Sequence, residues 1–311
     1  MDSLIFSLNA TMPVFLVMVV GYILKQIGML SEEFVKCTNK FVFVVCMPAL
    51  LFKDIYAIDI INDFDLKYVA FCAIVTLFCT IVIWGVTRLC YDSSDRGEFI
   101  QGAYRGSAAI FGAAFIENIY GNTGMAPLMI IGAVPLYNMF AVIILTLEAP
   151  GRDNNKFKKT LVDVCKNPMI ISIFVGIVFS YLGIDLPKIA DTTIEMFARL
   201  VSPLALICIG AGFEGKKAIA RIKPTVIATI IKLLVQPVIF IPIAIWIGFT
   251  GDKLVALLIM LGAPATASAY IMAKNMNHEG VLSSSIIVLT TILSSFTITA
   301  GLFILRFYGY V

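Results

Sequence analysis

The sequence predicts an all-α integral membrane protein with ten transmembrane helices. These form two inverted five-helix repeats, with broken crossing helices 4 and 9. Three observations support this fold class. The 311 residues are 60% hydrophobic and 14% charged, with a mean hydropathy of +0.96, whereas soluble domains carry about 25% charged residues. Ten apolar runs are long enough to cross a bilayer, and a pattern of Gly and Pro occurs twice along the chain.

The spans are defined by length and composition, since a transmembrane helix needs about 20 mostly apolar residues. The predicted spans cover residues 4–24, 34–52, 67–89, 99–119, 125–147, 167–182, 189–213, 222–247, 254–273 and 281–307. The first run follows Asp2 rather than a basic segment. We therefore interpret it as the first span and not as a cleaved signal peptide.

Positive charge alternates between the connections and predicts the orientation. The odd-numbered connections hold most of the Lys and Arg outside the spans, whereas the even ones hold few. The second connection is acidic, with Asp54, Asp59, Asp63 and Asp65. Because basic connections stay on the cytoplasmic side, we expect a multi-pass protein of the cell membrane with both termini extracytoplasmic.

The internal repeat has a fixed offset of 155 residues. It relates Pro13 to Pro168, Gly21 to Gly176, Gly28 to Gly183, and Pro48 to Pro203. An odd number of spans separates the two halves, so the second half must be inverted in the membrane, as in many transporters. The predicted units are residues 1–150, a cytoplasmic connection at 151–165, and residues 166–311.

The fourth and ninth spans occupy matching places in this repeat and are poor in large apolar side chains. The ninth contains G-A-P-A-T-A-S-A-Y at 262–270, and the fourth contains G-A-Y-R-G-S-A-A at 102–109. Pro264 removes a backbone donor, and irregular backbone at membrane depth occurs only inside protein or along a wet cavity. The ninth span is either a proline-kinked packing helix or a broken helix at a substrate site.

Five motifs link the chain to a known family. They are M-P-V-F-L-V-M-V-V-G-Y at 12–22, F-V-F-V-V-C-M-P-A-L-L-F at 41–52, Y-R-G-S-A-A-I-F-G-A at 104–113, K-L-L-V-Q-P at 232–237 and G-A-P-A-T-A-S-A-Y-I-M-A at 262–273. In order and spacing they resemble the auxin efflux carrier family in its short bacterial form. The sequence departs from the family's fourth-helix pattern at two positions, with Ser107 in place of Asn and Ala114 in place of Pro.

The resemblance implies a fold related to that of bile acid–sodium symporters. It implies a scaffold of helices 1, 2, 6 and 7, a mobile transport domain of helices 3–5 and 8–10, and a homodimer formed through the scaffold. The substrates it implies are small organic anions, which are auxin in plants and malate- or malonate-type carboxylates in bacteria. No cofactor is implied.

Two basic residues within the spans are candidates for attracting an anion. Lys232 lies about 15 Å beyond the start of its span, at 1.5 Å per residue, which is the midplane. Three interpretations of Lys232 are open. Its ammonium replaces a bound cation among free carbonyls, or it pairs directly with an anionic substrate, or the lysine is buried in its neutral form. For Arg105 the alternatives are a role in the anion site, a side chain that extends to the membrane surface, or a cap on the end of a neighbouring helix. Arg199, by contrast, is expected to pair with Glu195 one turn earlier.

Neutral groups near the expected helix breaks complete the predicted substrate site. They are Ser107, Ala108, Asn138, Pro264, Ala265, Thr266, Ser268 and Tyr270. Asn138 lies mid-span, where its amide is either a wall of the site or an interhelical hydrogen-bonding group. Broken helices would also direct their N-terminal donors toward the crossing.

Composition argues against other classes of protein. The chain has one histidine and no C-x-x-C pair among its seven cysteines, so we expect no metal site and no catalytic residues. A net charge of +3 implies no nucleic-acid partner. We expect a secondary transporter of small organic anions, with coupling to Na⁺ or H⁺ left open. The alternative is a membrane receptor that binds a ligand without moving it.

Overall fold

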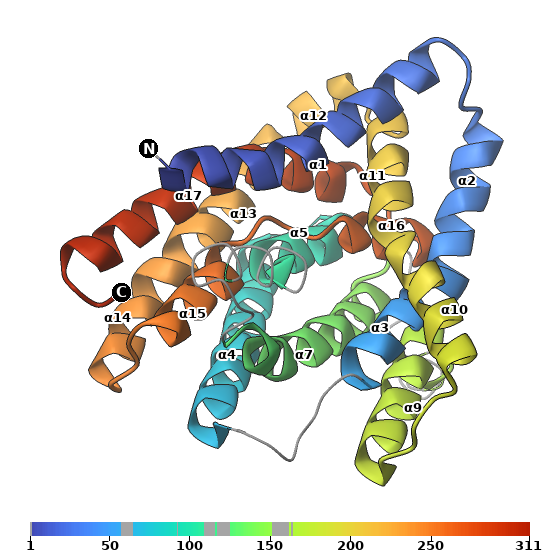
Figure 1. Cartoon of the computed structure of the whole chain (residues 1–311). Helices are drawn as coiled ribbons and strands as arrows, with labels where there is room; N and C mark the ends of the chain where they lie inside the picture. Colours follow the sequence, from blue (N-terminus) through green and yellow to red (C-terminus); the bar gives the residue numbers. More distant parts are fainter. Residues whose placement is uncertain are drawn as a thin grey trace.

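The computed structural model describes residues 2–56, 65–91, 93–108, 116, 125–150, 162 and 164–311, without the side chains of 2–8 and 10. Regular structure in this part of the chain is helical throughout (Figure 1). In chain order the main elements are α1 (Asp2–Gln26), α2 (Glu32–Phe41), η1 (Val42–Cys46), α3 (Met47–Tyr56), α4 (Leu66–Cys90), α5 (Arg96–Tyr104), α7 (Ala126–Leu147), α9 (Pro168–Leu182), α10 (Lys188–Arg199), α11 (Val201–Ala211), α12 (Gly215–Ala220), α13 (Ile222–Ile230), η2 (Ile231–Val235), α14 (Gln236–Trp246), α15 (Asp252–Gly262), α16 (Ala267–Asn275) and α17 (Val281–Phe307).

Seven segments of the described chain are long and apolar enough to cross a membrane. They are Glu32–Tyr56, Leu66–Cys90, Ala126–Leu147, Lys188–Ala211, Ile222–Trp246, Asp252–Asn275 and Val281–Phe307. Two shorter apolar helices, Thr11–Gln26 and Pro168–Leu182, match the first and sixth predicted spans. The predicted all-helical, multi-pass character is confirmed, while most of the fourth span after α5 lies outside the described residues, as do Ala114 and most of the 151–165 connection.

Local capping explains where several helices begin and end. The Ser31 hydroxyl accepts a hydrogen bond of 3.0 Å from the Phe34 amide at the start of α2. The Asp65 carboxylate does the same for the Tyr68 amide at the start of α4, also at 3.0 Å. Such caps satisfy donors that have no partner within the helix. Gly183 ends α9 in the left-handed conformation, with φ of 60°, which favours glycine.

Described residues of several odd-numbered connections lie at one end of the molecule. Residues of the first, seventh and ninth connections line one cavity, and His278 of the ninth contacts the carbonyl of Leu145 near the inner end of α7. Contacts between Lys53 and Asp191 and between Lys253 and Asp65 join residues at the opposite end. These described residues therefore lie at two ends of the molecule, and the assignment of one end to the cytoplasm stays a prediction.

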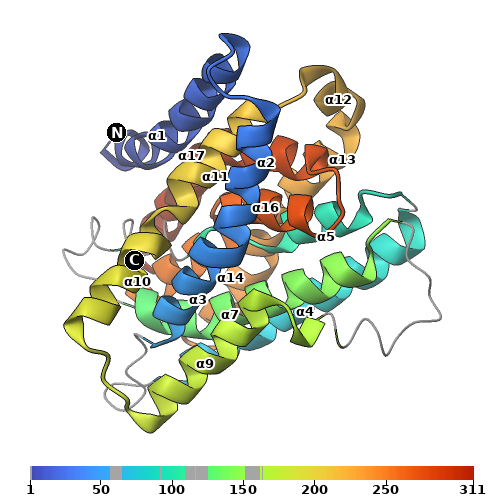
Figure 2. The same cartoon turned by 90° about the vertical axis from the view of Figure 1, so that its right-hand side faces the viewer.

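One assignment from the sequence was wrong. Asp54, expected in the second connection, lies inside α3, and so does Lys53. The helix continues past the expected end of the span because it packs against α9 and α10 (Figure 2). Tertiary packing here stabilises a turn that hydropathy alone assigns to a loop.

The ninth predicted span is broken. α15 ends at Gly262, Ala263 has extended backbone angles of φ −63° and ψ 148°, and α16 starts at Ala267. The fourth span also leaves the helical conformation, since α5 ends at Tyr104 and Arg105 is extended, with φ −90° and ψ 129°. The extended stretch between α15 and α16 runs through the centre of the molecule beside α5 (Figure 1). The ninth span is thus interrupted rather than a continuous kinked helix, and its place at a substrate site stays a prediction.

Candidate functional site

The two extended stretches meet through their backbones. The Ser107 amide donates a hydrogen bond of 2.8 Å to the Pro264 carbonyl. The next donor on the second stretch, the Ala265 amide, binds the Thr290 hydroxyl of α17 at 3.0 Å. We call residues 105–108 and 263–268 the junction. Ser107, Ala108, Pro264, Ala265, Thr266 and Ser268, all predicted site residues, lie in it.

Lys232 binds the backbone exposed by the break in the ninth span. Its ammonium donates hydrogen bonds of 2.7 Å to the Leu261 carbonyl and 3.2 Å to the Met260 carbonyl. Both carbonyls lie in the last turn of α15, where intrahelical donors run out. The side chain is completely buried, and a cation at a helix C-terminus is stabilised by the helix dipole. Lys232 thus donates to backbone carbonyls at the end of a helix.

Gln236 binds a carbonyl at the end of α5 in a similar way. Its amide nitrogen donates a hydrogen bond of 2.6 Å to the Ala103 carbonyl, in the last turn of α5. Lys232 lies in η2 and Gln236 directly follows it, so one turn of this helix holds the C-terminal ends of both α5 and α15. η2 is a π-helical segment, a local widening that is frequent at functional sites.

Arg105 lies at the centre of a polar cluster on the other side of the junction. Its guanidinium donates to the Asn138 side-chain oxygen at 2.5 Å, the Ser268 hydroxyl at 2.9 Å and the Met272 sulfur at 2.9 Å. Thr266 and Ser268 share a further hydroxyl contact of 2.9 Å. The structure therefore brings Arg105, Asn138, Thr266 and Ser268 together.

Two basic side chains, those of Arg105 and Lys232, lie on the two sides of the junction. Arg105 is 5% exposed and Lys232 is not exposed at all. Among the described residues neither forms an ion pair with a carboxylate, and their hydrogen-bond acceptors are neutral. A buried charge without a counter-charge is costly, so two such basic groups close together are a feature that a site for an anion would explain.

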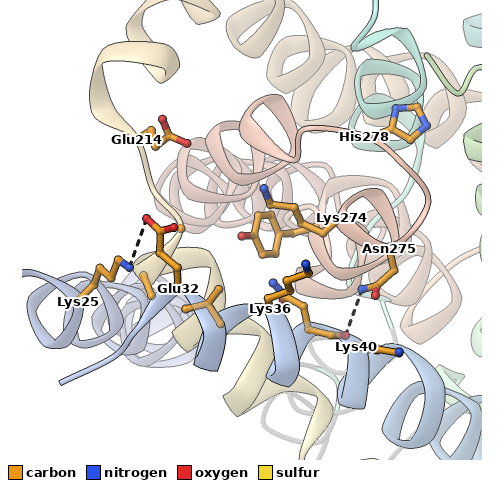
Figure 3. A pocket seen from close by; sticks show the side chains of 13 residues that line it. Lys25, Glu32, Lys36, Lys40, Glu214, Lys274, Asn275 and His278 are labelled. Carbon is orange, nitrogen blue, oxygen red and sulfur yellow. Dashed lines mark hydrogen bonds and ion pairs between the residues drawn. The ribbon is translucent and has the colours of Figure 1, made fainter. Parts of the chain in front are cut away.

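A large cavity opens beside the junction, toward the odd-numbered connections. We call it the vestibule. It has a volume of about 580 Å³, and Figure 3 shows the side chains around it. Its lining includes Lys25, Glu32, Lys36, Asn39 and Lys40 from α1 and α2, Glu214 after α11, and Tyr270, Lys274, Asn275 and His278 from α16 and the turn that follows.

The vestibule carries a surplus of positive charge. Four lysines and two glutamates line it. Lys25 lies 3.9 Å from Glu32, and Glu214 pairs with Lys217 at 2.9 Å. In the described chain Lys36, Lys40 and Lys274 have no carboxylate partner. Like-charged walls around a concave site raise the local concentration of the opposite ion.

Tyr270 belongs to the vestibule rather than to the junction. Its hydroxyl is buried without a hydrogen-bond partner in the described structure, and it lies close to Gly212 at the end of α11. Ser268 and Lys274 are six residues apart on α16, which is about 9 Å along a helix. One helix thus connects the junction to the vestibule.

Known proteins resemble this chain over nearly its whole length. A family model described as "Membrane transport protein", the auxin efflux carrier family, matches residues 6–301. The chain belongs to this family of membrane transport proteins. The resemblance found in the motifs is thereby confirmed.

Three distant relatives align with this chain over almost the whole length of both proteins. An uncharacterized transporter of Methanothermobacter thermautotrophicus is 22% identical over 93% of this chain and 95% of its own. The uncharacterized transporter YfdV of Escherichia coli K12 is 23% identical over 97% of this chain and 98% of its own. A putative malonate transporter of Rhizobium meliloti is 23% identical over 95% and 94%.

Several residues of this membrane transporter were missed or undervalued in the sequence. Neither Gln236 nor Thr290 stands out in the sequence as a site residue, although the spacing of four residues between Lys232 and Gln236 places both on one helix face. The vestibule lysines were used only to orient the chain, because nothing in the sequence shows that three distant connections surround one cavity. No cluster of three metal-ligating side chains occurs in the described ranges.

Proposed function

We propose that this chain is a secondary transporter that moves small organic anions, carboxylates of the malate or malonate type or auxin-like acids, by alternating access. The observation that carries the proposal is the pair of buried cations, Arg105 and Lys232, on either side of one junction with only neutral described partners. A bound carboxylate supplies the missing negative charge. The relative described as a putative malonate transporter supports this substrate class.

The inverted repeat in this proposal is supported by matching close contacts. A Cβ atom at Gly21 of α1 would lie 2.4 Å from the Ile207 carbonyl oxygen of α11, so the two backbones touch there. A Cβ atom at Gly176 of α9 would lie 3.1 Å from Cβ of Ile55 on α3. Gly21 and Gly176 are the pair related by the 155-residue offset. α1 packs on α11, which belongs to the seventh predicted span, and α9 of the sixth span packs on α3 of the second. A two-fold relation between the two halves requires this correspondence.

The contacts of Lys232 favour the first of its three interpretations. Two carbonyl oxygens at the end of a broken helix are the ligands that sodium-coupled carriers offer to Na⁺. A lysine ammonium in that place fixes one positive charge within the protein. In this proposal the carrier keeps an electropositive junction without a bound Na⁺, and the substrate anion is held chiefly by Arg105 and the donors at the start of α16.

The vestibule serves as the cytoplasmic entrance. Its walls come from α2 and α11, which belong to the scaffold that the resemblance implies, and from α16, which belongs to the mobile domain. Motion of the mobile domain against the scaffold closes this cavity and opens a path to the opposite side of the membrane. Pairing of two copies through the scaffold leaves the mobile domains free to move.

Flux of malonate into proteoliposomes tests the proposal. We expect uptake of labelled malonate above that of empty liposomes, and an at least tenfold loss in Arg105→Gln. Arg199→Gln is the matched control, because Arg199 is exposed and pairs with Glu195 of its own helix. Folded protein that moves neither malonate, malate nor indole-3-acetate would falsify the proposal. Calorimetric binding of one of these acids without flux would instead favour a receptor.

A further inference from the structure

One carboxyl group lies in an apolar segment of the described chain without a partner. Asp54 is in α3, part of the segment Glu32–Tyr56 that is long and apolar enough to cross a membrane. It is half-buried, and among the described residues it forms no hydrogen bond or ion pair. Ionisable residues inside such segments are rare and mark ion pathways and proton relays. An unpaired carboxyl in this place therefore needs a functional explanation.

The charged residues of the surrounding helices do not neutralise Asp54. Lys53, the preceding residue, forms an ion pair with Asp191 of α10, and adjacent residues of a helix do not face each other. The elements in contact with α3 are α7, α9, α10 and η1. Of these described elements only α10 contains Asp, Glu, Lys, Arg or His, and its four are Lys188, Asp191, Glu195 and Arg199. The last two pair with each other, and Lys188 is exposed.

Asp54 lines a small cavity between α3 and α7. The cavity has a volume of about 10 Å³, which is room for a single water molecule. Apolar side chains of both helices form most of its wall, together with the polar side chains of Asp54 and Asn138. The side-chain oxygen of Asn138 accepts a hydrogen bond from Arg105, and an amide oxygen can accept a second one. A series of polar groups therefore leads from Arg105 through Asn138 to Asp54.

Asp54 lies far from the vestibule along one helical segment. α2, η1 and α3 follow one another as a single rod (Figure 2). Lys40 of α2 lines the vestibule, and Asp54 comes 14 residues later, about 21 Å along a helix. The vestibule has a volume of about 580 Å³ and the cavity at Asp54 one of about 10 Å³. The structure is thus open toward the lysines and closed toward Asp54.

Arg105 connects these two regions. It binds Ser268 on α16, the helix that leads to the vestibule, and Asn138, which shares a cavity with Asp54. In the proposed division of the carrier, α3 belongs to the scaffold and α7 to the mobile domain. Asp54 therefore lies at the boundary between the two, where a path from Arg105 to the other side of the membrane has to open.

We propose that Asp54 is a proton-binding site on the path between Arg105 and the end opposite the vestibule, and that a proton is taken up there together with the substrate anion. The proton comes from solvent, the carboxylate becomes a neutral carboxyl, and its O–H donates to the Asn138 oxygen directly or through one water molecule. This inference rests on the proposed function and deepens it, since it makes H⁺ the ion that accompanies the anion.

Electrostatic repulsion couples the two binding events. An ionised Asp54 repels an anion that approaches Arg105 from this end, and it offers Arg105 a competing negative charge, whereas the neutral carboxyl does neither. An anion at Arg105 in turn favours the neutral form of Asp54, because like charges close together oppose each other's ionisation. Linkage makes the effect reciprocal, so the affinity for the anion rises as the pH falls, and a bound anion promotes proton uptake.

Infrared difference spectroscopy tests the proton site directly, because a protonated carboxyl group has a carbonyl-stretch band of its own. The purified protein is titrated without and with malonate, which is labelled with ¹³C so that its own bands are displaced. We expect a carboxyl band whose midpoint rises with malonate by about 0.5 pH unit or more, equivalent to about threefold tighter proton binding. Asp54→Asn should lack this band. Asp185→Asn is the matched control and should keep it, because Asp185 is exposed in the loop between α9 and α10.

Two infrared results overturn the inference. One is the same carboxyl band in the parent and in Asp54→Asn, which would assign the band to another residue. The other is a midpoint that malonate does not move, which would leave the proton and the anion uncoupled.

The number of protons taken up with each bound malonate provides a second measurement. Calorimetry in two buffers of different ionisation heat gives this number, and the ionisation of malonate itself is the same for every variant. We expect net proton uptake by the parent and by Asp185→Asn, and loss of that uptake in Asp54→Asn. The asparagine resembles the neutral carboxyl, so this variant should still bind malonate at least as tightly as the parent. Unchanged proton uptake in Asp54→Asn, or failure of that variant to bind malonate, contradicts the inference.

The outcomes also distinguish this inference from the transport proposal. Proton uptake at Asp54 with bound malonate, in protein that shows no flux, supports the proton site and rejects the proposed transport. Malonate flux by protein whose proton uptake is the same in Asp54→Asn supports transport and rejects the proton site.

Discussion

Gly106 lies directly against the ammonium group of Lys232. A Cβ atom at Gly106 would lie 2.9 Å from both Cε and Nζ of Lys232, and 3.2 Å from the Ala263 carbonyl oxygen. The side chain of Lys232 can bend, but only by moving its ammonium away from the carbonyls that it binds. The absence of a side chain at Gly106 therefore sets the position of the buried charge.

Substitution of Gly106 tests that relationship. We expect Gly106→Ala to reduce transport at least tenfold while the protein still folds, since only a flexible side chain must shift. Gly85→Ala is the matched control, because a Cβ atom at Gly85 of α4 would have no neighbour within 4 Å. The comparison uses substrate flux and the melting temperature of each variant. Transport at the parent rate in Gly106→Ala would show that the lysine position is not critical.

Removal of the lysine itself distinguishes a cation substitute from a direct substrate partner. Lys232→Ala leaves the Met260 and Leu261 carbonyls without their donor, in a space that a small cation can enter. We expect this variant to lose transport in choline buffers and to regain part of it as Na⁺ is raised. The transport rate of the wild type should not depend on the Na⁺ concentration.

A different pattern is expected if the ammonium binds substrate directly. Lys232→Arg then retains affinity for the anion, and Na⁺ restores nothing to Lys232→Ala. Undiminished transport in Lys232→Ala without Na⁺ would remove any role for the charge.

Much of the junction is predictable because its signals are local. Pro264 with its small neighbours indicates a break, and the lack of a nearby acid makes Lys232 unusual at its depth. Both inferences use backbone hydrogen bonding and the cost of charge in lipid, which act on short segments. The structure adds that two backbone carbonyls at the end of α15 accept hydrogen bonds from Lys232.

Features assembled from distant segments were not predictable. The vestibule forms where the first, seventh and ninth connections meet. In a single sequence, nothing distinguishes the lysines of these connections from those of any other basic loop. Asp54 was misplaced because packing of α3 on α9 and α10, not hydropathy, decides where that helix ends. Tyr270 was placed at the junction by its nearness in sequence to Ser268, whereas the turn of α16 directs it to the vestibule.

The Arg105–Asn138 contact provides a test of whether the substrate supplies the missing counter-charge. Asn138→Asp changes one amide for a carboxylate of the same shape, 2.5 Å from the guanidinium. We expect the variant to melt at a higher temperature, because a buried cation gains its partner. We also expect it to lose most transport, since the internal carboxylate replaces the substrate.

The control for this experiment is Asn138→Ala, which removes the hydrogen bond without adding charge. That variant should be less stable than the parent, and its substrate affinity should fall less than in Asn138→Asp. A double substitution with Arg105→Gln should remove the effect of the aspartate, since close pairs are not additive. Normal transport by Asn138→Asp would contradict an anion site at Arg105.

Glu148 allows a prediction about stability and pH outside the membrane spans. Burial alone raises the pKa of its carboxyl, but hydrogen bonds from Trp84, Arg88 and Arg96 outweigh this and hold the pKa below its usual value. The carboxylate is 4% exposed and lies 2.7 Å from both Trp84 Nε1 and Arg88 Nε. A lowered pKa means that the stabilisation is complete above the unfolded value, about 4.3, and is lost as the pH falls through the folded value.

We therefore expect Glu148→Gln to be less stable than the parent at pH 7 by about 1.5–3 kcal/mol, the range for hydrogen bonds to charged groups. The difference should shrink as the pH is lowered below about 4, where the parent carboxyl becomes neutral as well. Melting temperatures of both proteins across pH 3.5 to 7 provide the measurement. Glu195→Gln is the control, because that exposed carboxylate pairs only with Arg199 on its own helix, and such surface pairs contribute about 0–1 kcal/mol. A difference between Glu148→Gln and the parent that stays constant over this range would mean that the carboxylate charge does not hold the ends of α4, α5 and α7 together.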